Sequence, residues 1–158
     1  MFQTKHAWIK SFSIFLALTF LAAAFGSLFQ PGAWYAGLDK AVLNPPNFVF
    51  APVWTILYLL MPISATWVYM RARTRYEAEL ARNIFLGQLL LNALWSFLFF
   101  GLESPVLALI DLVCLWFAVV TMIYFFARIS LKAALLQVPY LLWLSFAGYL
   151  NIAIWWLN

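Results

Sequence analysis

Residues 105–127 read PVLALIDLVCLWFAVVTMIYFFA, a continuous apolar run in which Asp111 is the one charged side chain. A helix needs roughly 20 apolar residues to cross the ~30 Å hydrocarbon core of a bilayer, and this run is long enough. Four further runs of similar character lie at residues 11–29, 48–70, 83–101 and 133–157. Backbone polar groups must be paired internally in lipid, so each run is expected to be a helix. The sequence therefore predicts an all-α integral membrane protein, a five-transmembrane-helix bundle forming one domain over residues 1–158.

The composition supports the same class of protein. The chain is 67% hydrophobic and 9% charged, whereas about a quarter of the residues in a soluble domain are charged. The net charge of +4 is accounted for by the cations that flank the spans, so nucleic acid is not expected as a partner. Only one cysteine, Cys114, and one histidine, His6, are present. We therefore expect neither a disulfide within the chain nor a metal site.

The distribution of Lys and Arg predicts an orientation. If every run crosses the bilayer, Lys40 alone lies on one side, and the other eight cations lie together on the opposite side: Lys5, Lys10, Arg71, Arg73, Arg75, Arg82, Arg128 and Lys132. Cytoplasmic loops retain an excess of Lys and Arg. We expect the N-terminus inside and the C-terminus outside, in a multi-pass protein of a bacterial inner (cytoplasmic) membrane. An outer-membrane location stays open.

The segments between the runs differ in length. Residues 71–82 are expected to be a charged inner loop, and residues 102–104 and 128–132 short turns. Residues 30–47 are long enough to have a structure of their own and contain aromatic and proline residues, which is typical of a lid. Ala22-Ala23-Ala24 resembles a signal-peptidase site, but the first run is longer than a usual signal core, and we expect it to be retained.

Polar and aromatic side chains converge in the outer half of the predicted bundle. A rise of about 1.5 Å per residue places them within a few helical turns of the outer surface, under the 30–47 loop. They come from four different spans and are Trp54, Tyr58, Asn92, Trp95, Ser96, Asp111 and Asn151. Such groups are costly in lipid and usually face the interior. We expect an outward-opening cavity roofed by the loop, although hydrogen bonds between helices or ordinary packing would also explain each residue.

Trp143 adds a deep aromatic side chain to this set. Ala147 follows it by one helical turn, and a small residue beside a large ring leaves room for a planar ligand. Pro139 precedes Trp143 by one turn and is expected to kink the fifth span.

Several stretches resemble the TspO/MBR family, also called translocator proteins or tryptophan-rich sensory proteins. The resemblance covers nearly the whole chain in order, with matching span lengths. Its residues are Gly26-Ser27, Trp34 to Lys40 (WYAGLDK), Asn44-Pro45-Pro46, Pro52-Val53-Trp54, Leu57-Tyr58, Gly87-Gln88, Leu91-Asn92, Trp95, Phe99-Phe100-Gly101, Asp111, Pro139 to Trp143 (PYLLW), Phe146 and Leu150-Asn151.

The resemblance implies a compact five-helix bundle, often a homodimer, that binds porphyrins such as protoporphyrin IX and synthetic benzodiazepine-type ligands under the first loop. The implied pocket residues are Trp54, Tyr58, Asn92, Trp95, Trp143 and Ser145, with Asp111 and Ala147 as weaker candidates. The roof candidates are Trp34, Tyr35 and Lys40, and Asn151 lies beneath them. No cofactor is required, and a porphyrin is expected as ligand.

Two departures from the family pattern matter. Residues 41–43 read Ala-Val-Leu where the family commonly has Pro and Trp, so one loop aromatic is missing. The cholesterol-recognition pattern needs a Tyr followed by a basic residue near the end of span five, and residues 150–156 contain neither. This pattern is weak even when complete. High-affinity cholesterol binding is therefore not expected.

Three functions fit these residues. The first is a membrane receptor or carrier for tetrapyrroles, with a role in tetrapyrrole or stress regulation, in which deep tryptophans stack on the ring and Lys40 pairs with a propionate. Without a histidine in the bundle, the metal-free ring should bind at least as well as haem. The second is light- and oxygen-dependent breakdown of the porphyrin, with Trp54 and Trp143 as electron donors. The third is a membrane scaffold whose ligand changes its partners.

Overall fold

The computed structural model describes residues 5–158, which are helical without strands in the part described. Five segments are long and apolar enough to cross a membrane: Lys5–Gly26, Asn47–Arg71, Arg75–Gly101, Pro105–Ile129 and Leu131–Leu157. The elements are α1 (Lys5–Gly26), α2 (Ala33–Gly37), the 3₁₀ turn η1 (Asn47–Val49), α3 (Phe50–Arg71), α4 (Arg75–Ser96), the π-helical turn η2 (Phe97–Gly101), α5 (Pro105–Ile129), α6 (Leu131–Leu135) and α7 (Val138–Leu157). The predicted all-α class and the five spans are confirmed.

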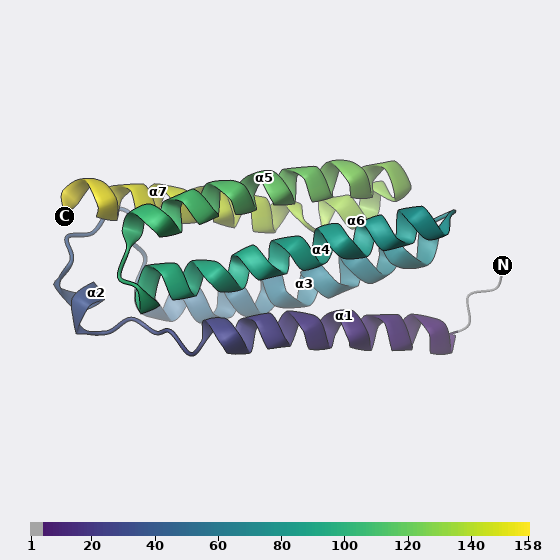
Figure 1. The fold of residues 1–158 in the computed structure, drawn as a ribbon, viewed down its shortest axis with the longest axis horizontal. Helices are drawn as coiled ribbons and strands as arrows, with labels where there is room; N and C mark the ends of the chain where they lie inside the picture. Colours follow the sequence, from purple (N-terminus) through teal and green to yellow (C-terminus); the bar gives the residue numbers. More distant parts are fainter. Residues whose placement is uncertain (1–4) are drawn as a thin grey trace.

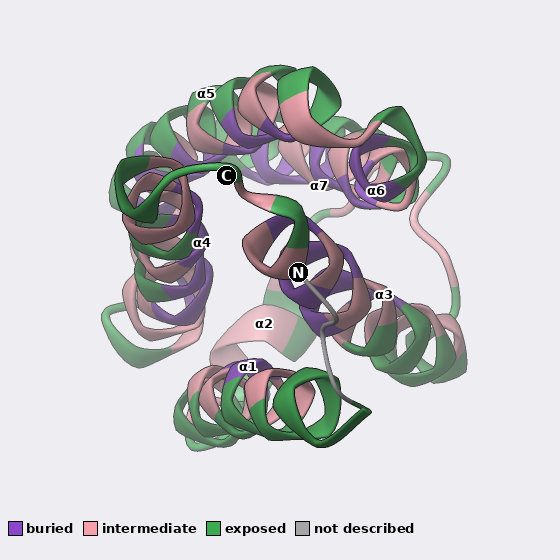
Figure 2. Cartoon of the chain, turned by 90° about the vertical axis from the view of Figure 1, so that its right-hand side faces the viewer, coloured by how far each residue is buried: buried purple, intermediate pink, exposed green. Residues whose placement is uncertain are grey.

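The long helices run side by side, with the start of α1 at one end of the bundle and α2 beside the end of α7 at the other (Figure 1). We call these the basic end and the loop end, because eight of the nine Lys and Arg residues lie at or near the first. Helix α5 packs against α4 and α7, while α1 packs against α3 and α4. Buried residues face inward and exposed residues outward (Figure 2). Exposed apolar side chains around the outside are what a lipid-facing surface requires.

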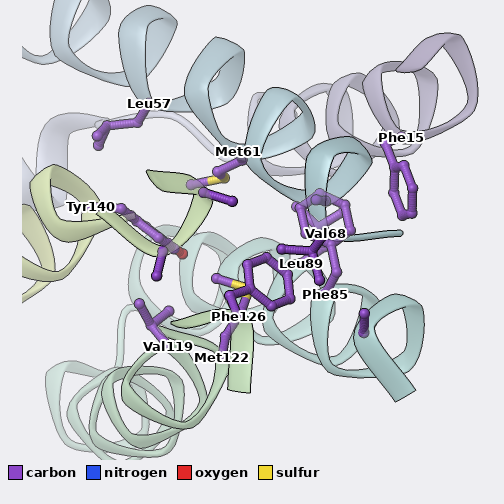
Figure 3. Packing of buried hydrophobic residues seen from close by; sticks show 14 of the residues in the cluster. Phe15, Leu57, Met61, Val68, Phe85, Leu89, Val119, Met122, Phe126 and Tyr140 are labelled. Carbon is purple, nitrogen blue, oxygen red and sulfur yellow. The ribbon is translucent and has the colours of Figure 1, made fainter. Parts of the chain in front are cut away.

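Most of the buried apolar side chains belong to one cluster, part of which is shown in Figure 3. Phe85 is fully buried, and its ring meets Phe15 edge-to-face at 5.2 Å between centroids. Val68, Met122 and Phe126 are fully buried in the same cluster. Because lipid is as apolar as these side chains, close van der Waals packing rather than exclusion of water holds the helices together.

The predicted inner loop at residues 71–82 is wrong, because helix α4 begins at Arg75 and leaves only a short connection after α3. The reason is a variant of the capping box, in which the glutamate binds the residue before the N-cap Thr74. Thr74 Oγ1 accepts a hydrogen bond from the Glu77 N–H at 3.1 Å, and Glu77 Oε2 accepts one from the Arg73 N–H at 2.7 Å. These bonds satisfy N–H groups at the start of the helix, and the acidic residue suits its positive pole.

Pro139 does not kink a continuous fifth span, contrary to the sequence-based expectation. The span is divided into α6 and α7 by a turn at residues 136–137, and Pro139 lies in the first turn of α7. Proline is well tolerated there because the N–H it lacks has no partner within the helix. The Gln137 side chain fills the break by donating from Nε2 to the Met61 carbonyl at 3.4 Å.

At the loop end, α4 continues as the π-helical turn η2. Gly101 lies under the Phe29 ring, and a Cβ built on Gly101 would lie 2.9 Å from Cδ1 of Phe29. A larger residue would push this ring away. Ser104 then starts α5, with Pro105 in the first helical turn as the sequence predicts. The wider turn and the glycine bring Phe99 and Phe100 under the 30–47 segment.

The capping box provides a test of the helix start. We expect Thr74→Ala to destabilise the first turn of α4 by about 1 kcal/mol, so amides 75–78 should exchange with deuterium several-fold faster. Thr55→Ala is the control, because the Thr55 hydroxyl binds its own helix at the Ala51 carbonyl. Unchanged exchange in Thr74→Ala would contradict the assignment of this start.

Candidate functional site

A cavity of about 350 Å³ lies at the loop end of the bundle. Residues from α1, α2, η1, α3, α4, η2, α5 and α7 line it, so it sits between the spans and below the 30–47 segment. Its aromatic lining consists of Tyr35, Phe50, Trp54, Tyr58, Trp95, Phe99, Phe100 and Trp143, and its other polar lining of Ser27, Asn47, Asn92, Ser96 and Asn151. The predicted cavity under the loop is present.

The aromatic residues form two walls. In the first, the Trp54 ring lies 5.1 Å from the Tyr58 ring and 6.3 Å from the ring of Tyr140, which is buried behind the lining. In the second, Trp95 stacks on Phe99, with centroids 4.9 Å apart and an interplanar angle of 18°. Rings held by other rings keep their orientation, so these walls offer preformed flat surfaces.

Asn92 forms a polar bridge at the cavity. Its Oδ1 accepts from the Tyr58 hydroxyl at 2.8 Å, and its Nδ2 donates to the Tyr140 hydroxyl at 2.9 Å. The amide therefore joins α4 to α3 and α7 while remaining part of the cavity lining. The sequence left two alternatives for Asn92, a hydrogen bond between helices or a place in the site. The structure shows that Asn92 has both.

Asn151 has a similar double position. Its Oδ1 accepts from Trp95 Nε1 at 3.2 Å, and its Nδ2 donates to the Pro105 carbonyl at 2.8 Å. The first bond satisfies an indole N–H at the cavity wall, and the second is an additional bond to a carbonyl in the first turn of α5. Asn151 thereby holds the Trp95 ring in its stack and connects α7 to both neighbouring helices.

The 30–47 segment forms the roof. Tyr35 contributes directly to the lining, while Trp34 packs edge-to-face on Phe99 at 5.7 Å. Lys40 lies with its Nζ 4.7 Å from the centre of the Tyr35 ring and donates to the Leu38 carbonyl at 3.0 Å. Burial of Tyr35 within the roof raises the pKa of its phenol. Trp34 and Lys40 support the roof and do not line the cavity.

Asp111 lies close to the cavity but not in its lining. The side chain is buried on α5, next to the lining residue Leu112. Neither carboxylate oxygen has a hydrogen-bond partner among the described residues. A carboxyl group in such a place needs a proton or an external donor. The sequence predicted an unusual carboxyl group within the span, but it did not show that this group lacks a hydrogen-bond partner.

Ser145 lies outside the cavity. Its hydroxyl accepts from Trp116 Nε1 at 2.9 Å and donates to the Leu141 carbonyl at 2.9 Å. Ser145 and Trp116 line a separate apolar groove between α5 and α7 on the outside of the bundle. Ala147 and Trp143, by contrast, line the cavity as the resemblance implies.

The sequence reasoning missed several residues that complete the site. Tyr140 was quoted only as part of a family stretch, yet it is the buried partner of Asn92. Phe50 and Phe99 also line the cavity, but apolar side chains do not stand out within an apolar run. The spacing from Asn92 through Ser96 to Phe99, which places the three along one helix face, would have identified Phe99.

Comparison with known proteins agrees with this geometry. The model of the TspO/MBR family matches residues 15–157. The "Tryptophan-rich protein TspO" of Chlorobaculum tepidum is 44% identical over 142 residues, covering 87% of this chain and 90% of the relative. The protein of the same name from Archaeoglobus fulgidus is 40% identical over 151 residues, covering 95% of each. The human "Translocator protein" is 35% identical over 153 residues, covering 94% of this chain and 89% of the relative.

The Asn151 bridge predicts a measurable loss of stability. Asn151→Leu leaves the Trp95 indole N–H without its acceptor and removes the side-chain bond to the Pro105 carbonyl, and we expect about 1 kcal/mol lower stability in detergent. The midpoint of thermal unfolding should fall, and Trp95 emission should change. Asn44→Ala is the control, because the Asn44 amide binds only locally, to the Pro45 carbonyl. Equal midpoints for Asn151→Leu and wild type would contradict the bridge.

Proposed function

Because this chain belongs to the TspO/MBR family, we propose that it is a membrane receptor or carrier that binds a porphyrin of the protoporphyrin IX type in the aromatic cavity. The observation that carries the proposal is a cavity lined by two groups of aromatic rings and by two asparagine amides. Three tryptophans from three spans, Trp54, Trp95 and Trp143, line one space. Such a space suits a ligand that is flat, apolar and polar only at defined atoms.

The walls and the amides match different parts of a porphyrin. The apolar ring faces favour stacking on indole and phenol rings. The Asn92 and Asn151 amides already join helices through their hydrogen bonds, so they provide fixed dipoles beside the ring rather than free donors. Smaller planar molecules, including benzodiazepine-type ligands, meet the same walls and fit the same proposal.

The propionates of a porphyrin need water or a cation. Lys40 is the one Lys or Arg among the residues of the 30–47 segment, and its ammonium group lies over the Tyr35 ring of the roof. A propionate that emerges from the cavity beside Tyr35 would meet this charge. The interaction would orient the ring with its acidic edge toward the loop end. In this arrangement the apolar edge points down toward Asn92.

A light-driven breakdown of the bound ring is the second candidate, and the Trp54 environment favours it. Trp54 lies between two phenols, Tyr58 and Tyr140, at 5.1 and 6.3 Å between ring centroids. In this version the photoexcited porphyrin takes one electron from Trp54, and a neighbouring tyrosine shares the oxidised state until the electron returns. Molecular oxygen adds across one methine double bond of the activated ring, this carbon–carbon bond breaks, and each oxygen atom ends in a carbonyl group, so that no further oxidant or reductant is needed.

Binding in the dark separates the site from partitioning into detergent. We expect protoporphyrin IX to quench tryptophan fluorescence saturably, with a Kd raised about three- to tenfold in Trp143→Phe because a smaller ring stacks on less of the ligand. Trp116→Phe is the matched control, because Trp116 lines the outer groove and should leave the Kd unchanged. Non-saturable quenching, the same in all three proteins, would overturn the proposal.

Illumination tests the second candidate. With oxygen present, the Soret absorbance of the bound ring should fall faster with wild type than with Trp54→Phe, because phenylalanine does not donate an electron to the excited ring. The two rates are compared at equal occupancy, established by the titration above. Equal bleaching by the two proteins would rule out Trp54 as the donor and leave binding as the function.

A further inference from the structure

The side chain of Asn158 fastens the roof of the cavity to the end of α7. Its Oδ1 accepts from the Asp39 N–H at 3.0 Å, and its Nδ2 donates to the Asp39 carbonyl at 3.1 Å. The amide therefore pairs with both backbone groups of one roof residue. The same Nδ2 donates to the Ile154 carbonyl at 2.9 Å, so the roof is tied to a residue that lines the cavity.

Asp39 lies at the boundary between the packed part of the 30–47 segment and its exposed part. Before it, the roof is held by packing, because Trp34, Tyr35 and Leu38 lie against the cluster of Phe99, Ala108 and Ile154. After it, the Asn44 N–H bonds locally to the Ala41 carbonyl, and Val42 is 98% exposed. The Asn158 bonds therefore fix the end of the packed part of the roof.

The cavity is small for the ligand proposed above. A volume of about 350 Å³ is near the lower limit of ~300–1,000 Å³ for pockets that bind drug-sized molecules. A substituted tetrapyrrole is larger than most such molecules, whereas a two- or three-ring aromatic fits. Tyr35, in the packed part of the roof, lines the cavity from above. Room for the larger ring arises when this part of the roof lifts.

We propose that Asn158 is a latch that determines which ligands the cavity accepts: with the Asp39–Asn158 bonds made, small planar aromatics bind, and a tetrapyrrole enters only after they break. This inference rests on the proposed porphyrin function. The latch lies at the exposed loop end, where water competes for both bonds. It therefore opens without disturbing the buried Asn92 and Asn151 bridges below.

A closed latch reduces the apparent affinity for any ligand that needs the open state, by the fraction of molecules that are open. Asn158→Ala removes both bonds to Asp39. We expect it to tighten the Kd of protoporphyrin IX about three- to tenfold, mainly through faster association. For a small ligand that fits under the closed roof, association and dissociation should both accelerate while the Kd stays the same.

The experiment is stopped-flow fluorescence in the dark with two probes, protoporphyrin IX and the three-ring fluorophore 1-aminoanthracene. It compares wild type, Asn158→Ala and Asn44→Ala, whose altered amide lies in the same segment and bonds to Pro45 alone. Asn44→Ala should behave like wild type with both probes. Asn158→Asp, which keeps the acceptor for the Asp39 N–H but loses the donor to its carbonyl, should fall between wild type and Asn158→Ala for protoporphyrin IX.

The outcomes separate the latch from the function on which it rests. Tighter protoporphyrin IX binding in Asn158→Ala with an unchanged 1-aminoanthracene Kd supports the latch. Weaker binding of both probes in Asn158→Ala would mean that Asn158 merely supports the end of α7. Identical kinetics in all variants would mean that Asn158 does not hold the roof. Either result would overturn the latch. If wild type binds 1-aminoanthracene saturably but not protoporphyrin IX, and Asn158→Ala does the same, the porphyrin function fails and the size filter with it. Faster 1-aminoanthracene exchange in Asn158→Ala would then still place the roof contact at Asn158.

Discussion

The Asn92 carboxamide, held between the Tyr58 and Tyr140 hydroxyls, is the interaction on which the site depends. The bilayer core offers no water as a hydrogen-bond partner for an amide or a phenol, so these three groups must form hydrogen bonds with one another. Their bonds set the spacing of α3, α4 and α7 at one level of the bundle. Below this level the helices pack through apolar contacts, and above it they enclose the cavity.

The arrangement above the bridge follows from the same constraint. Trp95 needs a partner for its indole N–H, and Asn151 provides one while also binding the Pro105 carbonyl. The indole ring is thereby fixed in its stack with Phe99, and this pair supports the roof through Trp34. Polar groups that must be paired in lipid therefore position apolar surfaces that a ligand can use. Asp111 and Gln88 are among the exceptions, because neither the Asp111 oxygens nor the Gln88 amide atoms have a hydrogen-bond partner among the described residues.

Much of this could be read from the sequence because lipid imposes simple rules. Run length predicted five spans, and the depth of Asn92, Trp95 and Asn151 predicted a cavity under the 30–47 segment. Hydropathy placed the start of the third span too late, because the first turns of α4 are charged although they are helical. The Thr74-to-Glu77 capping box was overlooked because the residues around it are charged, although its spacing is a known helix-start signal. Residues two apart on a helix point to nearly opposite sides, whereas residues four apart share a face. The spacing of Ser145 from Trp143 and Ala147 therefore indicated that Ser145 faces away from them, and only the family resemblance had placed it in the pocket.

Other features depend on tertiary structure. The contact between Asn158 and Asp39 joins positions 119 residues apart, and no local pattern predicts such a bond. The π-helical turn at Phe97–Gly101 likewise depends on packing, here of Gly101 under Phe29. The side of the membrane that the basic end faces stays a prediction from charge.

The most direct test of the account is the induced circular dichroism of protoporphyrin IX in its Soret band. The ring is achiral, so it acquires a signal when a chiral site holds it in one orientation, and none when it dissolves in detergent. Ala147→Trp fills the cavity beside Trp143 without altering the Asn92 bridge. The account predicts a saturable induced signal with wild type that Ala147→Trp abolishes. A signal that is absent from wild type, or unchanged in Ala147→Trp, would show that the cavity is not a porphyrin site.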